Sequence, residues 1–339
     1  MCDRGQRAML NQKQPSGFRR SRISRYSGSM NQRLTPATAA LLLIPPLTWA
    51  GNAIVGRLMN QQVPPMTLNM LRWVIATAIL APLGWRIWHH RALVLQALPR
   101  LMALALAGMF SYNSFQYLAL NTSTPINVTL VASIMPFWML LAGRLFFNVP
   151  IKAHSLIAVG FTLCGVALVL SRGDISNLLS IQLVPGDAWM LLATLGWTTY
   201  SWLLAKPTPA QSELSAHWAP FLWIQMVIGI GWSGIATAAE WWVLPALGGP
   251  VPQMTWDTGV WLALVYVGVA PALIAYRCWG LGVSRAGPNI AVFFASLTPV
   301  FAAVMSTFAL KEAPHWFHYV AFGCILTGIW ITSRPRENA

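Results

Sequence analysis

The segment NVTLVASIMPFW, residues 127–138, is an apolar run with a proline set inside it. A second segment, NIAVFFASLTPV at residues 289–300, has the same cadence: an Ala-Ser pair, two further residues and a proline. Proline in a helix interior removes a hydrogen bond and clashes with the preceding turn, at a cost of about 3 kcal/mol. A costly residue that recurs in the same setting indicates a repeated structural feature.

The two segments lie 163 residues apart, and the same offset aligns other landmarks of the sequence without a gap. The aligned pairs are Pro125 with Pro288, Ala132-Ser133 with Ala295-Ser296, Pro136 with Pro299, Gly160 with Gly323, and Gly165 with Gly328. Nearer the amino terminus, at a shorter offset, Leu47 aligns with Leu195 and Trp49 with Trp197. The sequence therefore predicts two related halves.

Composition indicates which solvent surrounds these halves. Of the 339 residues, 56% are hydrophobic and only 9% are charged, with a mean hydropathy of +0.56. A soluble domain carries about 25% charged residues, so this chain could not keep a large surface hydrated. Residues 101–143 contain no Asp, Glu, Lys or Arg. A helix that spans a bilayer needs about 20 mostly apolar residues, and the sequence predicts an all-α membrane protein with many of them.

Proline, glycine and polar residues divide the chain after residue 36 into ten apolar segments. The predicted spans are 37–57, 66–88, 99–120, 124–147, 153–171, 187–206, 216–239, 258–281, 287–310 and 314–333. The first five form a repeat over 37–171 and the last five a second repeat over 187–333. Because five is odd, the second repeat must enter the membrane upside down. We expect ten transmembrane helices in two inverted five-helix repeats.

Basic residues predict which span ends face the cytoplasm. Eight of the 22 Lys and Arg residues lie in the first 33 positions. This Ser-rich, acid-poor stretch predicts a disordered cytoplasmic tail over residues 1–36, or an upstream start codon with Met30 opening the protein. The loops on the same side carry Arg86, Arg91, Arg100, Arg144, Lys152, Lys206, Arg285, Arg334 and Arg336. Positive charge accumulates on the cytoplasmic side, so both termini of this multi-pass protein are predicted to face the cytoplasm from the cell inner membrane.

Inverted repeats are typical of secondary transporters, which bind substrate near the bilayer midplane and rock one half against the other. Pro136 and Pro299 fall near the middle of spans four and nine, where a proline frees backbone carbonyls. Such carbonyls are tolerated in a membrane only where protein or a water-filled cavity satisfies them. We predict a pair of helix bends that face the central cavity. The alternative is that each proline kinks its helix only for packing.

Several of these segments resemble a known family. LTWAGNAIVGR at residues 47–57, LRW at 71–73 and the paired ASIMP and ASLTP segments are similar to EamA-type members of the drug/metabolite transporter superfamily. The resemblance covers about residues 37–333. It implies ten helices in a 5+5 inverted arrangement. It also implies export of amino acids, related metabolites or drugs across the bacterial inner membrane.

Polar and aromatic residues at helical spacing predict the substrate-binding surface. Asn113, Gln116 and Tyr117 are spaced i, i+3 and i+4, which puts them on one face of span three. The same logic selects Trp49 and Asn52 on span one, Ser133 and Pro136 on span four, Trp197 on span six, and Asn289, Ser296 and Pro299 on span nine. The alternative is interhelical hydrogen bonding by small polar residues, worth about 0.6 kcal/mol each.

Two arginines lie within predicted spans. Arg277 lies near the end of span eight, where a long side chain can snorkel to the interface. Arg72 lies deeper, within span two, and its fork of donors suits a carboxylate. We expect Arg72 either to cap backbone carbonyls of a neighbouring helix or to face the cavity and bind an anionic group of the substrate. Most of the 18 tryptophans, such as Trp85 and Trp242, are expected at the membrane interfaces.

Other function classes lack their required residues. No GxSxG, HExxH or GxxxxGK[ST] motif is present, and the four cysteines have no metal-ligand spacing. We therefore expect no enzyme, no catalytic residue, no metal and no cofactor. The expected partners are a small-molecule substrate and the lipid bilayer but no nucleic acid, and the protein is expected to be a monomer or a homodimer. An importer or facilitator of the same fold, or a membrane receptor or scaffold, are the alternatives to an exporter.

Overall fold

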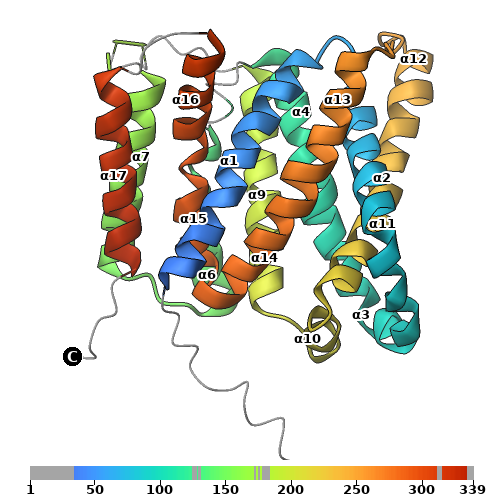
Figure 1. Cartoon of the computed structure of the whole chain (residues 1–339), viewed down its shortest axis with the longest axis horizontal. Coiled ribbons are helices and arrows are strands. Elements are labelled where there is room, and N and C mark those ends of the chain that lie inside the picture. The colour runs from blue at the N-terminus through green and yellow to red at the C-terminus, as the bar shows by residue number, and fades with distance from the viewer. Residues whose placement is uncertain are drawn as a thin grey trace, which may run out of the picture. The chain divides into compact units, whose positions relative to one another are not determined.

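The computed structural model describes residues 34–123, 128, 131–171, 173–174, 176–177, 184–310 and 315–333. All regular secondary structure in these ranges is helical (Figure 1), which confirms the all-α prediction. Parts of the chain with predictions attached lie outside the described residues: most of the basic tail (1–33), part of span four (124–127 and 129–130) and the basic carboxyl end (334–339).

Helices of the first half follow the predicted spans. They are α1 (Pro36–Leu58), α2 (Pro65–Gly84), η2 (Trp85–His90), α3 (Arg91–Leu104), η3 (Ala105–Ser111), α4 (Tyr112–Thr122), α6 (Met135–Phe147) and α7 (Ala153–Leu170). The predicted loop between spans two and three is itself helical, since helical residues run from Pro65 to Thr122. The backbone of His90 (φ −111°, ψ 29°) leaves the helical region and turns the chain between η2 and α3.

The second half shows one clear departure from the predicted boundaries. Its helices are α9 (Pro185–Ala205), α10 (Pro209–Ser215), α11 (Trp218–Ala238), η4 (Ala239–Val243), α12 (Leu244–Ala246), α13 (Thr258–Gly268), η5 (Val269–Ile274), α14 (Ala275–Ala286), α15 (Pro288–Ala295), α16 (Thr298–Leu310) and α17 (Trp316–Ser333). Span seven was predicted to end at residue 239, but its helix continues to Ala246. Glu240 is therefore a buried helical residue and not part of an external loop.

Helix length and composition identify the membrane-crossing segments. Four helical segments are long and apolar enough to cross a membrane: Pro36–Leu58, Pro65–Thr122, Trp218–Ala246 and Thr258–Ala286. Shorter apolar helices of 10–17 residues are Met135–Phe147, Ala153–Gly165, Pro288–Ala302 and Tyr319–Thr332. The described helices thus form a multi-pass membrane protein. The count of ten spans stays a prediction.

The backbone repeats itself at the predicted offset. Each end of α16 lies 163 residues after the corresponding end of α6, and α17 relates to α7 in the same way. The π-helices η3 and η5 also end at equivalent residues, Ser111 and Ile274, and an α-helix follows each. π-Helical turns are rare and frequently occur at functional sites. Their recurrence directs attention to the helices that they precede, α4 and α14.

Helices of one half pack against helices of the other. α7 lies beside α17, as Figure 1 shows in green and red, and α2 lies beside α11. α4 packs on α9, and α1 packs on α14. These last two pairs are related by the repeat, because α1 corresponds to α9 and α4 to α14. The four helices α1, α4, α9 and α14 therefore surround the region where the halves meet.

The two repeated prolines lie at helix starts. Pro136 is the second residue of α6, and Pro299 is the second residue of α16. Each follows a turn closed by a backbone hydrogen bond, Ile134 N to Val131 O at 3.2 Å and Leu297 N to Phe294 O at 3.0 Å. The first N–H groups of a helix have no intrahelical acceptor, so a proline there removes no hydrogen bond. Spans four and nine are therefore broken at these turns, where the sequence predicted bends.

Candidate substrate site

A buried polar network connects α1, α2 and α4. Asn52 Nδ2 donates to Gln116 Oε1 at 3.0 Å, and Asn52 Oδ1 accepts from the Tyr117 hydroxyl at 2.9 Å. Arg72 Nη1 donates to the Tyr117 hydroxyl at 3.1 Å and to Asn113 Oδ1 at 2.6 Å. All five residues are buried. The first half of the chain thus supplies a continuous line of hydrogen bonds that runs from Gln116 to Asn113.

Arg72 is the positively charged member of this network and is 0% exposed. Its guanidinium carbon lies 5.0 Å from the ring centroid of Trp73, a cation–π contact. Its hydrogen bonds to described residues go to side chains, so the expected alternative of capping a neighbouring backbone is not what the structure shows. Nε and Nη2 of Arg72 have no hydrogen-bond partner among the described residues. A buried guanidinium with unpaired donors is costly, and an anionic group would satisfy it.

The π-helix η3 contributes backbone acceptors beside the network. Gly108 O accepts from Asn113 Nδ2 at 3.0 Å and also from the Tyr276 hydroxyl. Met109 O accepts from Trp73 Nε1 at 2.8 Å. Side chains of α2, α4 and α14 thus bind the carbonyls of this irregular turn. Such partners are needed wherever a helix inside a membrane departs from regular bonding.

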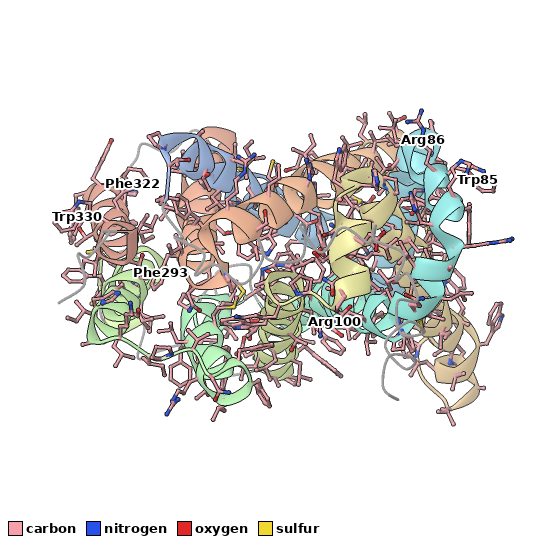
Figure 2. The ribbon with its side chains drawn as sticks, turned by 90° about the horizontal axis from the view of Figure 1, so that it is seen from below. Trp85, Arg86, Arg100, Phe293, Phe322 and Trp330 are labelled. Atoms are coloured by element: carbon pink, nitrogen blue, oxygen red, sulfur yellow. The ribbon has the colours of Figure 1, made fainter. Side chains whose placement is uncertain are left out.

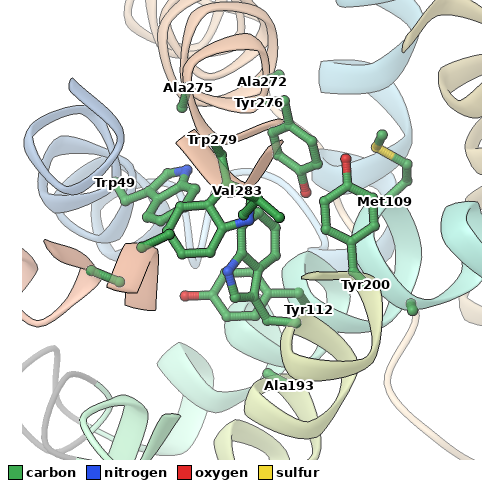
Figure 3. Packing of buried hydrophobic residues seen from close by; sticks show 14 of the residues in the cluster. Trp49, Met109, Tyr112, Ala193, Tyr200, Ala272, Ala275, Tyr276, Trp279 and Val283 are labelled. Atoms are coloured by element: carbon green, nitrogen blue, oxygen red, sulfur yellow. The ribbon is translucent and has the colours of Figure 1, made fainter. Parts of the chain in front are cut away.

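Aromatic side chains from both halves pack together in one cluster (Figure 3). At their centre is Trp197 of α9, which is 1% exposed. Its ring centroid lies 4.9–5.3 Å from those of Trp49, Tyr112, Tyr200, Tyr276 and Trp279. Figure 3 shows Tyr200 and Tyr276 approaching each other from opposite helices, α9 and α14. Tilted and edge-to-face arrangements of this kind are the preferred packing of aromatic pairs.

Equivalent residues of the two halves touch each other in this cluster. The Tyr276 hydroxyl accepts from Asn113 Nδ2 at 3.0 Å, and the two residues are 163 positions apart. Trp49 and Trp197, which the sequence aligns, pack edge to face at 4.9 Å. A residue that contacts its own counterpart must lie close to the axis that relates the repeats. The network and the aromatic cluster therefore meet at the junction of the halves.

A small space adjoins this junction and contains about 20 Å³. It is lined by Tyr112 and Gln116 of α4, by Ser133 and Ser296 at the two turns, and by Pro299. By this measure one water needs about 10–15 Å³. The space therefore has room for about one water.

Most of the predicted site residues come together in the structure. Trp49, Asn52, Arg72, Asn113, Gln116 and Trp197 belong to the network or to the aromatic cluster, and Ser133, Ser296 and Pro299 line the adjoining space. Pro136 is buried at the start of α6. Asn289 lies in the first turn of α15, and its Oδ1 has no hydrogen-bond partner among the described residues.

Sequence reasoning selected Trp49 and Trp197 but missed the other aromatic residues of the site. Most of the tryptophans were expected at the interfaces, and Trp85 at the outer edge of the helices is indeed exposed (Figure 2). Trp73 and Trp279, however, are both 0% exposed. A signal was present: Tyr276 and Trp279 have i, i+3 spacing on one helix, as do Trp197 and Tyr200. Large aromatic residues on one face of an apolar helix indicate an interior surface.

Residues 37–171 and 184–334 match the EamA-like transporter family. This chain belongs to that family. The resemblance that the sequence segments carried is thereby confirmed. Among relatives, an uncharacterized transporter from Archaeoglobus fulgidus is 26% identical over 315 residues, which cover 89% of this chain and 99% of the relative.

Two further comparisons bear on function and fold. The aromatic amino acid exporter YddG from Ancylobacter novellus is 22% identical over 280 residues, which cover 78% of this chain and 86% of that protein. A crystal structure with 19% sequence identity superposes with a TM-score of 0.65, and the match covers 87% of this chain and 96% of the other. The second comparison shows the shared fold alone.

Proposed function

We propose that this EamA-family transporter exports small metabolites, such as amino acids or drug-like compounds, across the inner membrane by alternating access. It would do so as a ten-helix protein with two inverted repeats and both termini in the cytoplasm. Arg72 carries the proposal, because it is fully buried at the junction of the halves and has two nitrogens without partners among the described residues. The similarity to an exporter of aromatic amino acids supports the direction of transport and the substrate class.

The site offers a polar end and an apolar wall. A substrate carboxylate would accept from Nε and Nη2 of Arg72, since a guanidinium presents its donors in a fork that matches two oxygens. The apolar part of the substrate would pack against Trp49 and Trp197, which lie beside the network. Such a pocket, mostly apolar with a few convergent polar groups, is the usual form of a small-molecule site.

Transport requires the halves to separate, because the space at their junction has room for about one water. Hydrogen bonds also join the halves at two places away from this space. Where α2 begins, both carboxylate oxygens of Glu240 accept backbone amides, from Met66 and Thr67, at 3.0 Å each. Where α9 ends, Arg100 donates to Leu203 O at 3.1 Å. Alternating access would break one set of contacts while the other holds.

Reconstitution tests the proposal. Purified protein in liposomes should accelerate exchange or efflux of labelled amino acids relative to protein-free liposomes, and a panel including dicarboxylates and neutral drug-like compounds would define the class. Inside-out vesicles and intact cells would show the direction. Failure to move any compound of the panel would contradict a transport function, and transport of neutral compounds alone would contradict the role of Arg72.

A further inference from the structure

A second cavity lies on the other side of the aromatic cluster, between α9, α10, α11 and α14. Its volume is about 160 Å³, about ten times what one water needs by the same measure. It therefore admits a small organic molecule. The lining residues with relevant chemistry are Tyr200, Gln211, Trp218, Gln225, Tyr276 and Arg277. Tyr200 and Tyr276 also belong to the aromatic cluster, so they separate this cavity from the central network.

Gln225 gives the cavity a buried hydrogen-bond acceptor without a partner. Its side chain is 1% exposed, and its Nε2 donates to Phe221 O at 2.9 Å. Its Oε1 accepts no hydrogen bond from the described residues. An unsatisfied buried polar atom costs about 1–3 kcal/mol. A ligand that brings an N–H group to this carbonyl would remove that cost.

Gln211, which lines the same cavity, shows the difference. Its Oε1 accepts from Arg100 Nε at 3.0 Å, and its Nε2 donates to Leu203 O at 3.0 Å. Both ends of its amide are thus occupied within the protein. Of these two amides, only Gln225 has an oxygen without a hydrogen-bond partner among the described residues.

Arg277 supplies the opposite chemistry. Its guanidinium carbon lies 4.5 Å from the ring centroid of Trp218. This cation–π contact holds the guanidinium beside the indole. The N–H groups of a guanidinium form a fork that suits a carboxylate. The sequence predicts that Arg277 can snorkel to the interface, and this stays a prediction. In the structure Arg277 lines the cavity and is half-buried.

Gly280 leaves the cavity open. It belongs to the lining, and a Cβ built on it would meet no atom within 4 Å. Its counterpart 163 positions earlier is Tyr117, whose hydroxyl bonds to Arg72 and Asn52 in the first half. The first half thus places a large polar ring where the second half has no side chain. The cavity therefore lies in the second half, where no side chain takes the place that Tyr117 fills in the first half.

We propose that this cavity is a second ligand site, separate from the Arg72 network, for a small zwitterion with an apolar ring. The ligand's ammonium group binds Gln225 Oε1, its carboxylate binds Arg277, and its ring lies against Trp218 and Tyr276. Tyr276 also accepts a hydrogen bond from Asn113, so a ligand in this cavity would contact a residue that touches the Arg72 network. If the proposed function is right, the cavity would hold a substrate molecule before or after it occupies the central site. Ligand binding in the cavity does not depend on the proposed function.

Three probes with the same ring separate the two polar contacts. L-phenylalanine carries both charged groups, phenethylamine lacks the carboxylate, and 3-phenylpropionate lacks the ammonium group. Equilibrium dialysis of the purified full-length protein in detergent would give their affinities. We expect Gln225→Leu to weaken L-phenylalanine and phenethylamine by about tenfold and to leave 3-phenylpropionate unchanged. We expect Arg277→Gln to weaken L-phenylalanine and 3-phenylpropionate by a similar factor and to leave phenethylamine unchanged.

A cavity-filling variant tests the location without removing a polar group. Gly280→Leu places a side chain in the open space and should lower the binding of all three probes at least about tenfold. Gly231→Leu is the matched control, because Gly231 of α11 also has nothing within 4 Å of a built Cβ but does not line the cavity. It should bind the probes like the parent.

Each outcome decides. Binding that is unchanged in Gly280→Leu, or that does not follow the pattern of the Gln225 and Arg277 variants, would overturn the second site. Absence of binding for all three probes to the parent would overturn it as well. Gly280-sensitive binding by a protein that transports nothing in liposomes would leave this site standing and contradict the proposed function. If the protein transports substrate but its probe binding is insensitive to Gly280→Leu, the proposed function would stand and the second site would be overturned.

Discussion

Helices α4 and α14 occupy equivalent places in the two halves, yet their side chains differ in kind. Each follows a π-helix that ends at the equivalent residue. Asn113 of α4 corresponds to Tyr276 of α14, and Gln116 corresponds to Trp279, at the offset of 163. Where the first half has amides that bond to Arg72 and Asn52, the second half has rings that pack on Trp197.

This difference shows that the repeat preserves backbone geometry while the chemistry of the site diverges. A site with matching groups on both sides would favour a symmetrical ligand. A site with a cationic network on one side and an aromatic wall on the other favours a molecule with one anionic end and one apolar end. The two sides meet along the Asn113–Tyr276 contact, so under the proposed function such a molecule would bind in one orientation.

Changing Arg72 breaks the polar side of this comparison and has the largest expected effect. Arg72→Lys keeps the charge and loses the fork of donors. A hydrogen bond to a charged group contributes about 1.5–3 kcal/mol, so transport of a carboxylate-bearing substrate should fall about ten- to a hundredfold. Transport of a neutral substrate should fall much less. Initial rates in proteoliposomes for one substrate of each kind would measure the difference.

Thermal melting in detergent provides the check on Arg72. If Arg72 serves only to hold Asn113 and Tyr117 in place, both substrates will be affected alike and the melting temperature will fall. That result would refute the carboxylate role. Arg86→Lys is the control, since Arg86 is exposed at the outer edge of the helices (Figure 2) and should tolerate the change.

Gly108 of the first half lies in a tightly packed region, whereas Gly280 of the second half lies beside the open cavity. A Cβ on Gly108 of η3 would lie 2.4 Å from Cδ2 of Tyr200, a buried ring that has little room to move. Gly108→Ala should therefore destabilise the protein by about 1–3 kcal/mol. Gly280→Ala should leave the stability unchanged or raise it by about 0.5–1 kcal/mol, because its Cβ meets nothing and alanine favours helix. Equal melting temperatures for the two variants would contradict the close approach of Tyr200 to η3.

Glu240 tests how the two halves are joined where α2 begins. It belongs to the second half and accepts the first amides of α2, which the helix itself cannot satisfy. Glu240→Gln turns one acceptor into a donor that faces an N–H group. We expect a loss of about 1 kcal/mol, typical of a lost helix cap, seen as a lower melting temperature. Glu213→Gln, at an exposed position of α10, should melt like the parent; a similar fall there would show that the effect is one of charge alone.

Much of the first half's contribution could be predicted from sequence because it follows helical spacing. Asn113 and Gln116 lie one turn apart, and both join the network. The repeat located the helix breaks at the two prolines. The sequence could not show whether each proline kinks one helix or starts a new one, because proline is compatible with both. The backbone hydrogen bonds of the preceding turn distinguish the two cases.

Other features of the structure depend on contacts that no local pattern encodes. Glu240 looked like a loop residue because its partner, the start of α2, is far away in sequence. The π-turn of η3 has no composition signal, and its carbonyls are satisfied by Trp73 and Tyr276 from other helices. An open cavity beside Gly280 is likewise a property of its surroundings. These features follow from tertiary packing, which a single sequence does not display.

Substitution of the two prolines should have the smallest effect. It tests whether the helix breaks in spans four and nine are stabilised in the same way. From the sequence, we expect Pro136→Ala or Pro299→Ala to insert normally and to impair transport by straightening a bend. In the structure both prolines lie at the second position of a helix, so alanine removes no clash and changes no hydrogen bond. The loss is then one of pre-organisation, at most about 1 kcal/mol.

Because the turns before both prolines are closed by equivalent backbone bonds, the two variants should also resemble each other, with small and similar decreases in melting temperature. Transport would fall only if alanine let the chain become helical through the turn, since Ser133 or Ser296 would then leave the space that both line. Spin labels placed on α15 and α16, either side of the second turn, would report that change as a longer distance. A large effect from one proline and none from the other would show that the repeat-related breaks are held by different forces.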